Sequence, residues 1–155
     1  MMKKNVLNNE VRKFLEEHAT AAVATVSSDG SPQVATMYYD IDKDLNFYFI
    51  AASNSGKLKN IKLNKYVAIA VGFGPEPVTV QAGGEAEISL EANDKLVEKI
   101  LGKIKFQSLD QWPVLWLEKG GLVVLKVKPK WLTFLNFDKE GHPETYSHDF
   151  HRLLP

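Results

Sequence analysis

The stretch from Phe47 to Val71 constrains the fold of this chain more than any other. Its residues predict a buried strand, a turn of Ser, Asn and Gly, one lysine-rich helix and a second buried strand. A helix that opens directly off a strand presents unpaired backbone N–H groups and the positive end of its dipole to whatever lies above the strand end. Such a place suits an anion, and phosphate in particular.

The lysines of this helix allow two interpretations. Ser55 is the predicted N-cap, and Lys57 follows two residues later, where its ammonium adds a positive charge to the anion site. Lys59, Lys62 and Lys65 continue along the helix. Because runs of charge are usually a solvated face of a surface helix, the stretch alone leaves both an anion site and a solvated face open.

Length and charge limit the alternatives. The 155 residues, 45% of them hydrophobic, suffice for one domain, which we expect to span residues 1–155. The polar residues 138–155 are expected to be a loosely docked tail. Because 19 basic residues balance 19 acidic ones, no overall field draws the protein to nucleic acid or to an anionic membrane. An anion site must therefore be local.

Several chemistries are excluded by the residues present. The chain has no cysteine, which excludes disulfides, thiolate metal sites and cysteine nucleophiles. His142, His148 and His151 match no common ligand spacing, so we predict no metal site. A G-x-S-x-G nucleophile elbow is also missing, which argues against a hydrolase. Since the chain has no signal-peptide core and no run of 18 apolar residues, we expect a cytoplasmic protein.

The remaining residues predict strands and two further helices. The first helix is expected to begin at an N-cap at Asn8 or Asn9, and its apolar stripe consists of Val11, Phe14, Leu15 and His18. A later helix is expected at residues 93–105. The predicted strands cover residues 20–27, 33–41, 45–52, 66–73, 78–90, 122–127 and 131–137.

Glycine and proline residues predict irregularities in the later strands. The pair Gly83 and Gly84 predicts a bulge or a close backbone approach, because glycine otherwise weakens a strand interior. Pro129 is expected to separate the last two strands. Short, closely spaced strands with only one strand–helix–strand crossover favour a mainly β fold, an antiparallel β-barrel with flanking helices.

Four segments in this order resemble one known family. They are AAVATVSSDGSPQVATMYY, FYFIAASNSGKLKNIKLNKYVAIAV, VTVQAGGEAEI and VVLKVKPKWLTFLNF. From about Val11 to Phe137 the chain is similar to the flavin-binding split-barrel family whose best-known member is pyridoxamine 5′-phosphate oxidase. The resemblance implies a six-stranded antiparallel split barrel. It also implies a homodimer that holds flavin mononucleotide (FMN) in two grooves at the subunit interface.

The resemblance places the flavin phosphate at the start of the lysine-rich helix. Ser55 and Lys57 are its implied ligands, with Ala51 and Ser53 as further cofactor-binding residues. The family often has a hydroxyl residue where this chain has Ala51, and an arginine where it has Gly56. Phosphate binding is therefore expected to depend more on backbone N–H groups, Ser53, Ser55 and Lys57.

The flavin ring is implied to meet two other strands. Thr36, Met37 and Tyr38 supply the ring-edge contacts, and strand alternation places Thr36 and Tyr38 on one face while Met37 contributes mainly backbone atoms. Thr79 and Gln81 share a face of the later strand, where the amide of Gln81 both donates and accepts.

The tryptophans carry a weaker implication. Trp112, Trp116 and Trp131 are typical of core or dimer contacts. Trp112 is also placed where it can reach a neighbouring subunit's cofactor.

We therefore predict an FMN-binding oxidoreductase that uses a small-molecule electron donor or acceptor. Two alternatives remain open, a deazaflavin-dependent reductase of the same fold and a non-catalytic, stress-associated flavin-binding protein. The Trp and Arg-x-His pattern that forms the substrate pocket of true pyridoxamine oxidases is missing, so the resemblance does not extend to that substrate.

Overall fold

The computed structural model describes residues 2–72, 74–89, 94–103, 121–136 and 150–154. The strands are β1 (Thr20–Val26), β2 (Pro32–Ile41), β3 (Phe47–Ala52), β4 (Tyr66–Val71), β5 (Val78–Ser89), β6 (Leu122–Asn136) and β7 (Phe150–Leu154). The helices are α1 (Met2–Glu17), α2 (Gly56–Leu63) and α3 (Asp94–Gly102).

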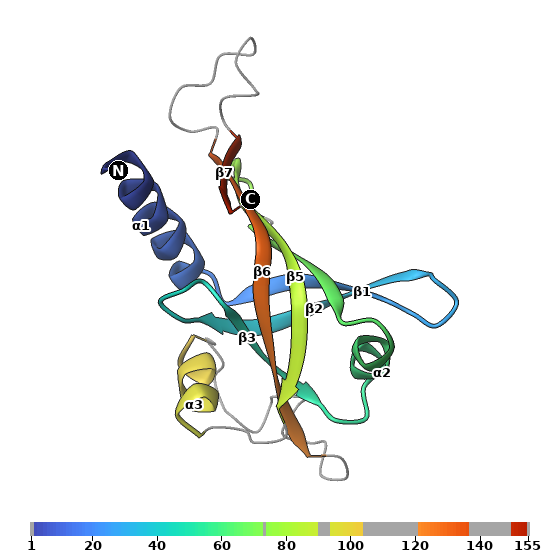
Figure 1. The fold of residues 1–155 in the computed structure, drawn as a ribbon. Coiled ribbons are helices and arrows are strands. Elements are labelled where there is room, and N and C mark those ends of the chain that lie inside the picture. The colour runs from blue at the N-terminus through green and yellow to red at the C-terminus, as the bar shows by residue number, and fades with distance from the viewer. Residues whose placement is uncertain (1, 73, 90–93, 104–120, 137–149, 155) are drawn as a thin grey trace.

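The strands form an antiparallel barrel. Their order is β3-β2-β1-β4-β5-β6-β7, and β3 also pairs with β6, which closes the first six strands into a ring. Strand β7 pairs with β6 outside this ring (Figure 1). Every pairing is antiparallel, and α2 forms the crossover from β3 to β4. The prediction of a six-stranded antiparallel barrel with flanking helices is confirmed.

Aromatic side chains fill the barrel beneath α1. Tyr39, Phe47 and Phe49 are fully buried, and their ring centroids lie 5.5–6.1 Å apart. Val11 and Leu15 of α1 are equally buried, and the Tyr39 hydroxyl donates a hydrogen bond to the Leu15 carbonyl at 2.7 Å. The apolar stripe that the spacing predicted in the first helix therefore packs on the barrel core.

The predicted start of this helix is wrong. Helix α1 begins at Met2, so Asn8 and Asn9 lie in its interior rather than at its N-cap. Asparagine costs only a fraction of a kcal/mol in a helix interior, roughly 0.7 at most, and the buried face outweighs that preference. His18 falls just beyond the helix, with Nδ1 2.7 Å from the Phe14 carbonyl oxygen.

The prediction that Pro129 separates two strands is also wrong. Strand β6 continues through it, because Pro129 lies opposite Gly84 at a shift in the β5–β6 register between Gly83 and Gly84. A bulge tolerates a residue without an N–H group. The bulge and the close backbone approach predicted from the two glycines are both present, since a Cβ on Gly84 would lie 2.0 Å from the Lys128 carbonyl oxygen.

The chain end contributes a strand that the sequence analysis did not predict. Residues 150–154 form β7 and pair with Leu132–Leu135 of β6. Leu153 is only 6% exposed and belongs to the main core. Residues 138–149 of the expected tail, and the predicted cofactor residue Trp112, lie outside the described residues.

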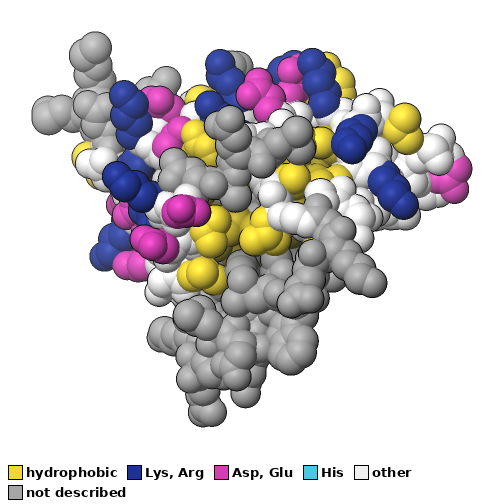
Figure 2. All heavy atoms as spheres, turned by 90° about the horizontal axis from the view of Figure 1, so that it is seen from below, with side chains coloured by type: hydrophobic (Ala, Val, Ile, Leu, Met, Phe, Trp, Pro, Cys, Tyr) yellow, Lys and Arg dark blue, Asp and Glu magenta, His cyan; other side chains and the backbone are white. Residues whose placement is uncertain are grey.

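The barrel end near α2 and α3 is seen from below in Figure 2. Apolar side chains are visible at the centre of this face, and charged side chains lie toward its margins. Helix α3 packs here through a second apolar cluster, in which Ile50 and Ile100 are buried.

Candidate cofactor site

The start of α2 has an open N-terminus. Ser55 is in extended conformation (φ −69°, ψ 151°), and its carbonyl accepts hydrogen bonds from the N–H groups of Leu58 and Lys59 at 3.1 and 3.2 Å. Its side chain makes no capping bond. In the described part of the chain the Ser55 hydroxyl is buried and has no hydrogen-bond partner. A buried hydroxyl without a partner is costly, which makes Ser55 a ready donor for a ligand at this point.

Two more donors lie beside this hydroxyl. The N–H groups of Gly56 and Lys57 belong to the first turn of α2 and take part in no hydrogen bond among the described residues. The Lys57 side chain is half-buried, whereas Lys59, Lys62 and Lys65 are exposed. The lysines thus divide into one at the helix opening and three on the solvated face.

Helix α2 is fixed against the barrel by a buried polar contact. Leu58 and Ile61 face the core, and between them Asn60 is 7% exposed. The Asn60 amide donates to Thr25 Oγ1 at 3.0 Å and to Gln33 Oε1 at 2.9 Å. Because Asn60 lies three residues after Lys57, this contact sets the orientation of the helix start against β1 and β2.

The end of β3 forms the base of the site. Ala51 is 3% exposed and its methyl group lies in the core, so only its backbone can contact a ligand. Ser53 is half-buried, and its N–H donates to the Gly121 carbonyl at 3.1 Å. That bond ties the β3–α2 turn to the start of β6.

Strand β2 separates from β3 beside this turn. The two strands pair only over Tyr39–Ile41, whereas β2 pairs with β1 over Pro32–Tyr38. The Tyr39 N–H points to Ala19 on the β1 side. Because the direction alternates along a strand, the backbone of Thr36 points away from β1, where β3 does not pair with it. At Thr36 the predicted ring-edge segment therefore has a strand edge that β3 does not pair with.

The outer face of the barrel carries the other predicted residues. Across the strands the register aligns Thr36, Ala22, Ala70, Gln81 and Thr133 in one row. Thr36 and Gln81 are exposed at two points of this row. The alanines between them, Ala22 and Ala70, have short side chains that project little from the sheet.

Three predicted residues are placed differently from Thr36. Met37 is 5% exposed with its side chain in the core, which agrees with a contribution through its backbone. Tyr38 packs under α3 in the second apolar cluster, so it does not share the open surface of Thr36. The hydroxyl of Thr79 is buried and without a partner among the described residues, as is that of Ser55.

Two exposed apolar side chains lie on this outer face, Trp131, which was predicted as a core or dimer contact, and Val34, which was not assigned. Val34 is 71% exposed and Trp131 is 36% exposed. The register places both in the row next to Thr36 and Gln81, joined by Ala24, Ala68 and Gly83. A Cβ on Gly83 would lie 2.4 Å from Trp131 Nε1, so the indole rests directly on the glycine backbone. Strand alternation in β2, which puts Val34 and Thr36 on one face, is the pattern that identifies this surface.

Comparison with known proteins bears on this site. A family model described as pyridoxamine 5′-phosphate oxidase matches residues 7–136. No curated protein matches the chain. Among the described residues no helix is long and apolar enough to cross a membrane, and no group of three metal-binding side chains occurs.

Solved structures share the fold. A pyridoxamine 5′-phosphate oxidase-related, FMN-binding protein from Nostoc punctiforme PCC 73102 is 14% identical with a TM-score of 0.60, over 96% of this chain and 85% of that one. An F420 reductase is 24% identical with a TM-score of 0.65, over 78% and 94%. General stress protein 26 from Bacillus anthracis str. Sterne is 23% identical with a TM-score of 0.63, over 83% and 92%.

Proposed function

Because the chain belongs to the pyridoxamine 5′-phosphate oxidase family, we propose that it binds FMN and acts as an oxidoreductase. One observation carries this proposal, the unpartnered buried hydroxyl of Ser55 at the open N-terminus of α2 beside half-buried Lys57. The similarity to an FMN-binding protein of the same fold supports the choice of cofactor.

The residues of the site match the parts of FMN. Ser55, the N–H groups of Gly56 and Lys57, and the Lys57 ammonium would hold the phosphate through charge-assisted hydrogen bonds. The open edge of β2 at Thr36 and the amide of Gln81 offer donors and acceptors to the polar edge of the ring. Bound FMN supplies the hydride or electron transfer, and the protein supplies binding and orientation.

Lys57→Ala should raise the dissociation constant for FMN about tenfold or more, because a phosphate loses a charged donor. Lys62→Ala, in the exposed last turn of the same helix, should leave it unchanged. Titration of purified protein with FMN, followed by flavin fluorescence, measures both. Riboflavin, which lacks the phosphate, should bind wild type and Lys57→Ala equally.

Two results would contradict the proposal. The first is wild-type protein that purifies colourless and gains no thermal stability with FMN, because a ligand that binds the native state must stabilise it. The second is an equal loss of FMN affinity in Lys57→Ala and Lys62→Ala, which would make Lys57 part of the solvated face.

We also propose that the protein is a homodimer whose second copy covers the outer face of the barrel. Thr36 and Gln81 lie three strand spacings apart, roughly 14 Å along the sheet, which supports a site shared between two copies. Exposed Val34 and Trp131 flank that row, and apolar surface of this kind commonly marks an interface.

Val34→Lys should convert the dimer into monomers, since it places a charge in the centre of the proposed interface. Val6→Lys changes an exposed valine of α1, away from the sheet, and should leave the molar mass of the dimer in solution unchanged. Light scattering after size exclusion, with and without FMN, measures both. A wild-type protein that is monomeric in both conditions would rule out the homodimer.

A deazaflavin-dependent reductase is the second candidate, because an F420 reductase has the same fold at 24% identity. Parallel titrations with FMN and with F420 separate the two. Turnover of reduced nicotinamide with a panel of acceptors tests catalysis itself, and a non-catalytic flavin carrier would show none above free flavin.

A further inference from the structure

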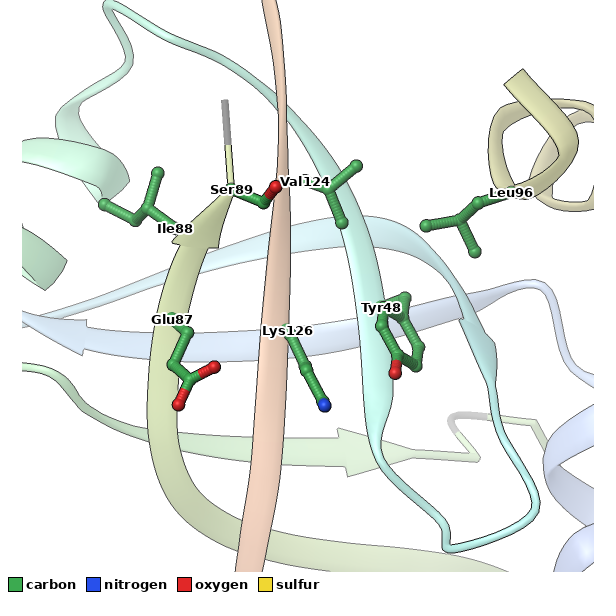
Figure 3. Close-up of a pocket in the computed structure, with 7 residues that line it drawn as sticks. All are labelled: Tyr48, Glu87, Ile88, Ser89, Leu96, Val124 and Lys126. Carbon is green, nitrogen blue, oxygen red and sulfur yellow. The ribbon is translucent and has the colours of Figure 1, made fainter. Parts of the chain in front are cut away.

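A pocket separate from the candidate cofactor site lies on the wall of the barrel opposite the β1–β4 pair. It is about 430 Å³ in volume and opens between α3 and the outer faces of β3, β6 and β5 (Figure 3). This volume is within the range of small-molecule sites, roughly 300–1,000 Å³. We call it the α3 pocket.

The polar side of the α3 pocket is one cross-strand row. The register aligns Tyr48 with Lys126 and Lys126 with Glu87. All three side chains line the pocket, and Figure 3 shows Lys126 between the other two. A phenol, an ammonium and a carboxylate are thus presented side by side, with neighbouring Cβ atoms about 5 Å apart.

The two opposite charges of this row do not pair with each other. No ion pair within 4.0 Å joins Glu87 and Lys126, and the Glu87 carboxylate has no partner among the described residues. The Lys126 ammonium lies 5.8 Å from the centroid of the Tyr48 ring. Lys99 of α3 and Lys103, just after the helix, both contact Asp40, at 2.6 and 3.2 Å. Among the described residues that line the pocket, Glu87 and Lys126 carry the charges, and Lys126 contacts the Tyr48 side chain.

Tyr48 is held in place without a ligand. Its hydroxyl is 3.0 Å from Asp42 Oδ2 and donates to it, and Asp42 also accepts bonds from the side chain and backbone of Asn46 at 2.8 and 3.0 Å. The ring beside Lys126 is thus part of a preformed wall.

The other side of the pocket is apolar. Val124 of β6 lies one step along the same outer face from Lys126, and Leu96 faces it from α3 (Figure 3). The pocket therefore has an apolar half next to a row with one positive and one negative charge. A simple anion would meet Glu87, and a simple cation would meet Lys126. A neutral apolar molecule would desolvate both charges without compensation.

We propose that the α3 pocket binds a small zwitterion of the α-amino acid type with an apolar side chain. Its carboxylate accepts from the Lys126 ammonium, its ammonium donates to the Glu87 carboxylate, and its side chain packs on Leu96 and Val124. A ligand that carries both charged groups on one carbon atom satisfies both sides of the row at once.

Calorimetric titration of the purified full chain tests the proposal with three probes: L-leucine, N-acetyl-L-leucine and L-leucinamide. L-Leucine should bind once per chain. The acetylated probe lacks the positive charge and the amide probe lacks the negative one, so each should bind at least about tenfold more weakly.

Two variants assign the contacts. Glu87→Gln should weaken binding of L-leucine at least about tenfold but not that of N-acetyl-L-leucine, which has no ammonium to lose. Lys126→Met should weaken the binding of L-leucine but not the binding of L-leucinamide. Lys128→Met, an exposed lysine two residues further along β6, is the matched control and should change nothing.

The opposite outcomes are equally clear. If L-leucine, L-isoleucine and L-phenylalanine all fail to bind saturably at millimolar concentration, the proposal is wrong. It is also wrong if all three probes bind alike, or if Lys128→Met has the same effect as Lys126→Met. Because the pocket lies apart from α2, these results do not depend on Lys57 or on flavin affinity.

Discussion

Gly84→Ala is expected to lower the free energy of unfolding by about 2–4 kcal/mol. The new Cβ would lie 2.0 Å from the Lys128 carbonyl oxygen and 2.9 Å from the Pro129 Cα. These atoms belong to the backbone of β6 and cannot rotate away as a flexible side chain would. The β5–β6 pair would have to separate at the bulge, which weakens the longest ladder of the barrel.

Gly102→Ala is the matched control. Nothing lies within 4 Å of the Cβ that it introduces, and Gly102 is the last residue of α3. Alanine in a helix is favoured over glycine by roughly 0.5–1 kcal/mol, so this variant should be neutral or slightly stabilising. Urea denaturation of the two variants and of wild type shows whether each substitution lowers or raises the free energy of unfolding. If Gly84→Ala were as stable as wild type, the close approach at the bulge would not exist in solution.

Asp40→Asn is expected to cost about 2–4 kcal/mol of stability at pH 7. Asp40 is 3% exposed, and it binds the ammonium groups of Lys99 and Lys103. The Lys103 side chain is itself only 16% exposed and lies 4.9 Å from the centroid of the Tyr39 ring. Removing the carboxylate charge leaves that ammonium without a counter-ion and loosens α3.

The pH dependence follows from the pKa of Asp40. Burial opposes the charge, but hydrogen bonds and attraction from Lys99 and Lys103 outweigh it and hold the pKa of Asp40 below its ordinary value of 3.8. A lowered folded-state pKa means that the stabilisation is fully present above the unfolded value and is lost as pH falls through the folded value. The difference in unfolding free energy between wild type and Asp40→Asn should therefore stay constant down to about pH 5. It should decrease progressively as the pH falls below about 4.

Asp44→Asn serves as the control for this measurement, because Asp44 is exposed in the β2–β3 turn. Its effect should stay within about 0.5 kcal/mol at every pH. An Asp40→Asn protein that loses no stability at pH 7 would show that the two lysines are adequately solvated without their carboxylate.

Elements that depend on neighbouring residues were predictable from the sequence, and features that depend on residues far apart in the chain were not. Strand β3, helix α2 and strand β4 were predictable because each depends on neighbouring residues: apolar runs for the strands, small polar residues for the turn. The bulge at Gly83 and Gly84 was predictable for the same reason. The continuity of β6 through Pro129 was not, because it depends on Gly84 lying opposite, forty-five residues earlier.

The same division applies to the sites. Ser55 and Lys57 could be proposed as anion ligands from the chain alone, since the strand–turn–helix order predicts the open helix N-terminus that the structure shows there. That Tyr38 lies under α3 while Thr36 remains exposed could not be predicted, because alternation places both on one face and only the packing of α3 distinguishes them.

The sequence by itself therefore determined the barrel class, most of the strands and the open N-terminus of α2, each from residues adjacent in the chain. Tertiary structure alone decided which exposed residues share a surface. Glu87 and Lys126 are thirty-nine residues apart and meet only through the β5–β6 register, which the burial of the whole core sets. The row from Thr36 to Gln81 likewise exists only because β1 and β4 pair between them.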